Sequence, residues 1–166
     1  MGFFDGLKRS MIEAMQQSGA FAEVHITEEY LPLAQESPLK KRVVCVGFEE
    51  IRSAAAGAAS YIGPQDGDGG EVYGREMEAL VSFRVYVPAA SGGIACHEVF
   101  SRLADYLLLT QNSHRVQSLR CGEISFCRSL SAYTLTAVAS IKTTAISAVT
   151  GGAALEDIVV LRSKNP

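Results

Sequence analysis

The feature that most constrains this chain is a long stretch without proline or glycine, RSLSAYTLTAVASIKTTAIS, at residues 128–147. From Tyr133 onward, the odd positions are mostly apolar, and the even positions carry mainly threonine, serine and lysine. Such a period of two is typical of a β-strand with one face in the core. Strands usually have about five or six residues, so we expect part of this strand to project beyond its sheet.

Other periodic segments predict two helices and further strands. Apolar residues recur every three to four positions in residues 3–17, and again in a stretch that follows a cap at Ser91 and ends near Thr110. Strand patterns cover residues 23–30, 42–48, 75–87 and 116–126, the last with a bulge expected at Gly122. This order favours an α+β fold: a mostly antiparallel sheet with helices packed on one face and a long projecting hairpin or loop.

The length of 166 residues corresponds to about one domain. We expect a single α+β domain over residues 1–147 and a flexible C-terminal tail over residues 148–166. Residues 53–74 are rich in glycine and alanine and predict a long loop insertion in that domain. The tail contains an apolar run at residues 158–161, which is suited to adding a strand to a neighbouring sheet.

Charge and hydropathy give no support for two classes of partner, nucleic acid and a membrane. The formal net charge of −3 provides no overall positive field for binding nucleic acid. No apolar run reaches the roughly 18 residues of a membrane span. The first residues lack the pattern of a secretory signal peptide, so we expect a cytoplasmic site of synthesis and residence.

Cysteine, histidine and glycine patterns do not indicate a cofactor or metal site. The histidines lie in three separate segments, and the glycine-rich segment has the wrong spacing for a dinucleotide or calcium loop. We therefore expect no catalytic residue, no metal and no cofactor. Four cysteines lack a C-x-x-C pair and lie in apolar stretches, which predicts reduced core thiols: Cys45, Cys96, Cys121 and Cys127.

A candidate subunit interface comes from the polar faces of two predicted strands. Glu76, Glu78 and Arg84 share one face of the strand over residues 75–87, a pattern that fits an ionic interface. The even positions of the long strand add hydroxyl groups and a lysine. The candidate interface residues are Glu76, Glu78, Arg84, Thr134, Thr136, Ser140 and Lys142.

Two stretches together resemble a known family. They are ALVSFRVYVPAASGGIACHEVFSRLADYLL (residues 79–108) and VQSLRCGEISFCRSLSAYTLTAVASIKT (residues 116–143). A strand ending in Val-Pro leads through a glycine-bearing turn into a helix of the form C-x-x-V-F-x-x-L. A long strand that begins with tyrosine and ends in a threonine pair follows. This order resembles the tail-terminator and tail-completion proteins of tailed phages and prophages, and the minor tail proteins near them. It covers less than half of the chain.

The resemblance implies an α+β fold and a closed ring of identical subunits, commonly six, at the end of the tail tube. Such a ring stops tube polymerisation and joins the tail to the head, so its partners are the tail tube protein and a head-completion protein. It implies neither sequence recognition of nucleic acid nor a membrane, and a location in the virion after assembly in the host cytoplasm. Residues 53–74 and the C-terminal tail depart from the pattern. Another component of the tail, or of the related contractile machines, therefore stays an alternative to a terminator.

Two further hypotheses belong to different classes. One is a small cytoplasmic binding module that docks a partner by strand addition at an exposed sheet edge. The other is an enzyme that uses a thiol at Cys96 or the acidic pair Glu76 and Glu78. The assembly hypothesis, without enzymatic activity, is the one that the residues favour.

Overall fold

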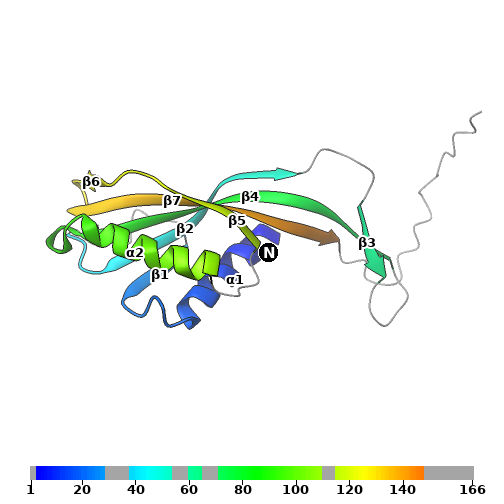
Figure 1. Cartoon of the computed structure of the whole chain (residues 1–166), viewed down its shortest axis with the longest axis horizontal. Coiled ribbons are helices and arrows are strands. Elements are labelled where there is room, and N and C mark those ends of the chain that lie inside the picture. Colours follow the sequence, from blue (N-terminus) through cyan, green and yellow to red (C-terminus); the bar gives the residue numbers. More distant parts are fainter. Residues whose placement is uncertain (1–2, 29–37, 54–59, 65–70, 110–114, 148–166) are drawn as a thin grey trace, which may run out of the picture.

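The computed structural model describes residues 3–28, 38–53, 60–64, 71–109 and 115–147 (Figure 1). The expected flexible tail, residues 148–166, lies outside them. In chain order the elements are α1 (Phe3–Gln17), β1 (Val24–Glu28), β2 (Arg42–Ser53), β3 (Ser60–Pro64), β4 (Glu71–Pro88), a 3₁₀ turn (Ala89–Ser91), α2 (Ile94–Ala104), a π-helical turn (Asp105–Leu109), β5 (Arg115–Cys121), β6 (Ser125–Cys127) and β7 (Ala132–Ser147).

The described strands form one sheet with the order β1-β2-β4-β7-β5, to which β3 adds beside β4 and β6 beside β7. All pairs are antiparallel except β1 with β2. Both helices lie on the same side of the sheet (Figure 1). The α+β fold class predicted from the sequence is therefore confirmed, as is the long two-faced strand at its centre.

The centre of the sheet is a long ladder between β4 and β7. All 16 residues of β7 pair with β4 without a register shift, from Ala132 opposite Pro88 to Ser147 opposite Tyr73. β2 pairs with β4 only as far as Met77, and β5 pairs with β7 only as far as Lys142. Beyond these points the ladder continues without them and carries β3 at its tip, where it projects from the rest of the molecule (Figure 1). We call β3 with residues 71–76 and 143–147 the arm, and the rest of the described chain the body.

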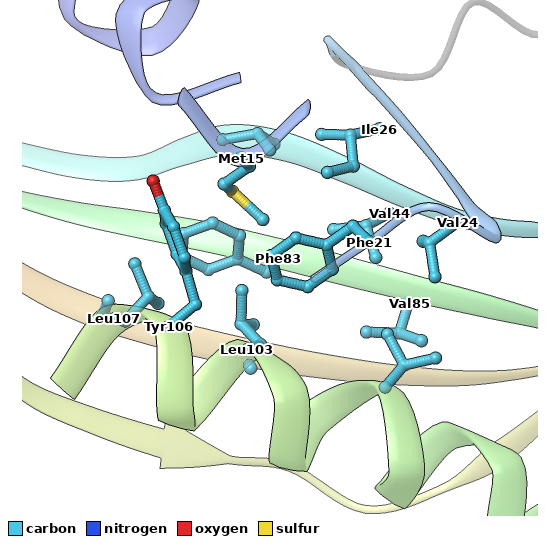
Figure 2. Packing of buried hydrophobic residues seen from close by; sticks show 14 of the residues in the cluster. Met15, Phe21, Val24, Ile26, Val44, Phe83, Val85, Leu103, Tyr106 and Leu107 are labelled. Carbon is cyan, nitrogen blue, oxygen red and sulfur yellow. The ribbon is translucent and has the colours of Figure 1, made fainter. Parts of the chain in front are cut away.

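The core lies between the helices and one face of the sheet. Alternate residues of β4 point to this face and are fully buried: Ala79, Val81, Phe83, Val85 and Val87. Met11 and Met15 of α1 and Val99 and Leu103 of α2 cover them, which explains the apolar stripe of each helix. Figure 2 shows Phe83 of the sheet between Met15 of α1 and Leu103 of α2. The rings of Phe21 and Tyr106 pack edge to face in the same core, with their centroids 5.7 Å apart.

Three local expectations require correction. Residues 53–74 are not a loop throughout, because they contain β3 and the first residues of β4. Ser91 does not cap α2: the N-cap is Gly93, without a side-chain hydrogen bond. Gly122 does not bulge within one strand but directly follows the end of β5, and a separate strand, β6, begins at Ser125. Its N–H donates to the Thr136 carbonyl oxygen at 2.8 Å, and a Cβ at this position would lie only 3.0 Å from that oxygen, so this close approach favours glycine.

Candidate interface on the helix-free face of the sheet

The side of the sheet opposite the helices brings the predicted interface residues together. We call it the open face; it consists of the even-numbered side chains of β4 and β7 with their register partners in β2 and β5. Glu78 pairs with Lys142, Arg84 with Thr136, and Leu80 with Ser140. Because side chains alternate between the faces of a strand, all seven residues predicted from the sequence lie on this one face. Their role in binding another subunit stays a prediction.

The middle of the open face is shielded by its own side chains. Ser82, Val138 and Ser140 are buried there, although no described helix packs on this side. Arg120 of β5 reaches Glu49 of β2 at a distance of 3.4 Å between Nη2 and Oε2, which spans β7 and β4. The small residues Gly47 and Ser82 lie in the same row of the sheet as Arg120, so the guanidinium has room to extend across it.

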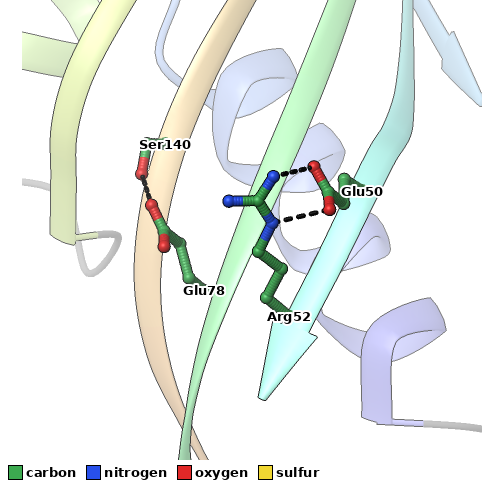
Figure 3. Close-up of polar contacts among 4 residues, drawn as sticks. All are labelled: Glu50, Arg52, Glu78 and Ser140. Atoms are coloured by element: carbon green, nitrogen blue, oxygen red, sulfur yellow. Dashed lines mark hydrogen bonds and ion pairs between the residues drawn. The ribbon is translucent and has the colours of Figure 1, made fainter. Parts of the chain in front are cut away.

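A β-bulge concentrates charge in the second half of β2. The register with β4 shifts between Phe48 and Glu50, so Glu49 is the extra residue. Arg52 donates from Nε and Nη2 to the two oxygens of Glu50, at 2.6 and 2.7 Å (Figure 3). These bonds lower the pKa of Glu50. Both groups are exposed, so the pair defines local geometry and adds little stability.

A hydrogen bond fixes Glu78 at the junction between the body and the arm. The Ser140 hydroxyl of β7 donates to Glu78 Oε1 of β4 at 2.8 Å (Figure 3). Lys142 is the register partner of Glu78, but it forms no ion pair within the described residues. Glu76 and Lys142 are exposed, and Thr134 and Thr136 are half-buried. The face therefore offers hydroxyl and charged groups to solvent or to a partner, and little apolar surface.

The other end of the open face is closed by a small second core. The segment before β2 and the turn before β7 bury Leu39, Val43, Cys45, Leu130 and Ala132 against each other. The backbone N–H of Leu39 donates to the Leu130 carbonyl oxygen at 2.9 Å and ties the two segments together. The open part of the face is thus the part nearest the arm.

The cysteines divide into two classes, which corrects the expectation of four core thiols. Cys45 and Cys96 are buried, whereas Cys121 is exposed and Cys127 is half-exposed. Burial raises the pKa of Cys45 to about 12, although nearby Arg84 lowers it in part. Burial also raises the pKa of Cys96. Reactive thiols need an electropositive and accessible environment, so Cys96 lacks the setting that the thiol-enzyme hypothesis requires.

The pKa of Cys127 is shifted in the opposite direction from those of Cys45 and Cys96. Its Sγ lies 3.2 Å from the Ser129 hydroxyl, and this hydrogen bond, with the backbone of Leu130, lowers the pKa of Cys127. The cause is the geometry of the turn at residues 128–131, which has no clear signal in the residue order. Sequence reasoning therefore pointed to Cys96 and missed Cys127.

We expect one thiol of the native protein to react first with a disulfide reagent at neutral pH, namely Cys127. A lowered pKa leaves more thiolate at a given pH, and that fraction rises through a lower pH range than for Cys121, whose pKa burial raises. Peptide mapping of the labelled protein identifies the site, and Cys127→Ser should remove the fast phase. Cys45 and Cys96 should react only on unfolding; rapid labelling of Cys96 would contradict this assignment and favour the enzyme hypothesis.

Comparisons with known proteins do not place the chain in a family: it matches no protein-family model and no curated protein sequence. Within the described ranges, no three His, Cys, Asp or Glu side chains gather as a metal site would require. None of the described helices has the length and apolar character needed to cross a membrane.

Proposed function

We propose that this protein is a non-enzymatic structural component of a phage or prophage tail. It forms a homo-oligomeric ring at the tail end, stops polymerisation of the tube and joins the tail to the head. Its partners are further copies of itself, the tail tube protein and a head-completion protein. The observation that supports this proposal most is the arm, which extends the central ladder beyond the body.

We expect the arm to be stable only when a partner covers one of its faces. A ribbon of two or three strands is marginally stable in water unless one face is covered. Of the arm side chains that the structure describes, Arg75, Glu76 and Thr144 are exposed and none is buried. Contact with a neighbouring copy would cover this surface, and the polar residues of the open face would lie beside it. A contact of this kind is heterologous, and a ring closes it without free ends.

The resemblance to tail proteins involves the elements that build the body. Residues 79–108 form most of β4 and all of α2, and residues 116–143 form β5, β6 and most of β7. Residues 53–74 depart from the family pattern, and their described residues 60–64 and 71–74 belong to the arm. In this proposal the body supplies the shared framework, and the arm adapts it to this particular assembly. The location is accordingly the virion, after assembly in the host cytoplasm.

The native mass in solution tests the ring. Sedimentation of the purified full chain should give one species at a multiple of the 17.8 kDa subunit mass, and electron microscopy should show closed rings. In the source phage or prophage, loss of the protein should give tails of uncontrolled length. A monomer at all concentrations would contradict the proposal.

A second candidate is a monomeric binding module that adds a partner strand to its sheet. It is favoured by the outer strands β1 and β5, each of which pairs on one side only among the described strands. The native mass separates the two candidates, because only the module is a monomer.

A further inference from the structure

Most free edges of the described sheet carry features that hinder the addition of another strand. Edge strands present unpaired backbone N–H and C=O groups, and proteins protect them with bulges, charged residues, proline or a covering helix. Helix α1 reaches the backbone of edge strand β1, because Gln16 Nε2 donates to the Ile26 carbonyl oxygen at 3.0 Å. The second half of β2, beyond its pairing with β1, contains the bulge at Glu49 and the ion pair of Arg52 with Glu50.

The outer edges of β5, β3 and β6 are protected in similar ways. β5 has a register shift after Val116 and carries the exposed Arg120. β3 has a register shift after Tyr61 and ends in Pro64. β6 contains only three residues. Bulges, charge, proline and short length all act against pairing with a further strand, so none of these edges is a favourable site for one.

The end of β7 is the exception among the described strands. Its residues 143–147, TTAIS, pair with β4 on one side without a register shift. On the other side β5 stops opposite Lys142, and no described residue pairs with residues 143–147 there. This stretch contains no charged residue, proline or glycine. We call its outer side the β7 edge; it lacks the usual protection, and such an edge is expected to be covered.

The chain itself supplies a suitable segment directly after the β7 edge. Nineteen residues follow Ser147 (166 − 147), and they include the apolar run IVVL at residues 158–161. Isoleucine and valine are enriched in strands. The ten residues between Ser147 and this run (157 − 147) contain Gly151 and Gly152, which suit a reversal of chain direction. A connection of this length is within the range found in compact domains.

We infer that residues 158–161 return antiparallel to β7 and pair with the β7 edge of the same chain. The connection leaves from the end of this edge, so it holds the run nearby at an effective concentration of roughly millimolar. A second copy would have to compete with that concentration. Backbone hydrogen bonds bind the run, as in other cases of strand addition. The inference does not rest on the proposed ring, because it involves one chain only.

Charged residues on both sides of the run fit an edge strand that ends the sheet. Glu156 and Asp157 precede it, and Arg162 and Lys164 follow it. Charges that flank an apolar strand act against further pairing. The run would therefore cover an unprotected edge and replace it with a protected one. The arms of separate chains would then be kept from pairing edge to edge in an uncontrolled way.

Hydrogen–deuterium exchange tests the pairing. In a chain that ends at Ser147, peptides covering residues 143–147 should take up deuterium about ten times faster or more than in the full chain, because their outward N–H groups lose their acceptors. Peptides from residues 133–141 should exchange as in the full chain. Equal uptake at residues 143–147 in the two proteins would overturn the inference.

A pair of proline variants keeps the chain at full length. Val159→Pro with Val160→Pro should give the same faster exchange at residues 143–147, because the two prolines remove two successive N–H groups, which point to opposite sides of a strand. Ala153→Pro with Ala154→Pro, between β7 and the run, is the matched control and should keep the slow exchange. If both variants exchange alike, residues 158–161 are not the segment that covers the edge, and the inference is wrong.

A cross-link shows which chain supplies the run. Thr144→Cys is combined with Val159→Cys or with Val160→Cys, since neighbouring residues of a strand face opposite sides, in a background of Cys121→Ser and Cys127→Ser. A short bifunctional thiol reagent should link one of these pairs within one chain, at the 17.8 kDa mass of a single subunit under denaturing conditions. Links that form only between chains would contradict the inference.

The ring and this pairing fail separately. Sedimentation of the same proteins reports on the ring. A monomeric wild type with slow exchange at residues 143–147 and the link within one chain would overturn the ring and support this inference. Assembled rings whose exchange is unchanged by removal of residues 148–166 would overturn this inference and leave the ring in place.

Discussion

Replacing residues 54–76 with an Asn-Gly turn should give a folded protein that no longer assembles. Ser53 of β2 lies directly opposite Met77 of β4, so a two-residue turn can join them as a hairpin. The replacement removes β3 and the β4 part of the arm. No described residue in this range belongs to the buried core, so we expect the free energy of unfolding of the body to change by about 1 kcal/mol or less.

The expected change in assembly is complete. If the arm contacts a neighbouring copy, the shortened chain should sediment as a monomer while its near-ultraviolet circular dichroism keeps the wild-type signature. Glu76→Ala is a useful comparison, because it keeps the arm backbone and removes one exposed charge; a partial loss is expected from it. Full-size rings formed by the shortened chain would refute the role of the arm.

Phe83→Ala should cost about 3–5 kcal/mol in the free energy of unfolding. Phe83 is fully buried between the sheet and the helices, and its removal leaves a cavity as well as lost apolar burial. The total stability of a domain of this size is about 5–15 kcal/mol, so the variant should unfold at a much lower urea concentration. His25→Ala, on the exposed side of edge strand β1, is the control and should stay within about 0.5 kcal/mol of the wild type. Equal urea midpoints for the two variants would contradict this description of the core.

The sequence predicted the elements with clear periodicity and missed those defined by distant contacts. Helix α1 and strands β4 and β7 follow from alternation or helical spacing, and the same alternation predicted which residues share the open face. Strand β3 was missed because its residues, SYIGP, combine glycine and proline with little alternation. The bulge at Glu49, the bond from Ser140 to Glu78 and the bridge from Arg120 to Glu49 depend on register between strands distant in the chain. Residue spacing along one strand does not specify that register.

The lowered pKa of Cys127 and the exposure of Leu109 were also beyond sequence reasoning. The first depends on a turn that places a hydroxyl beside the thiol. The second depends on a π-turn, which interrupts the spacing of the apolar stripe. Local backbone geometry, rather than residue type, decides which group the Cys127 thiol contacts and whether Leu109 faces solvent.

The unbroken β4–β7 ladder also sets an order of events during folding. Its innermost pair, Pro88 with Ala132, joins residues 44 positions apart (132 − 88), whereas its outermost pair, Tyr73 with Ser147, joins residues 74 positions apart (147 − 73). Closing the shorter loop costs less chain entropy, and pairs of large sequence separation form slowly. The ladder should therefore zip from the α2 end towards the tip. In the proposed assembly, the part of the ladder that lies in the body would therefore pair before the arm that contacts a neighbouring copy.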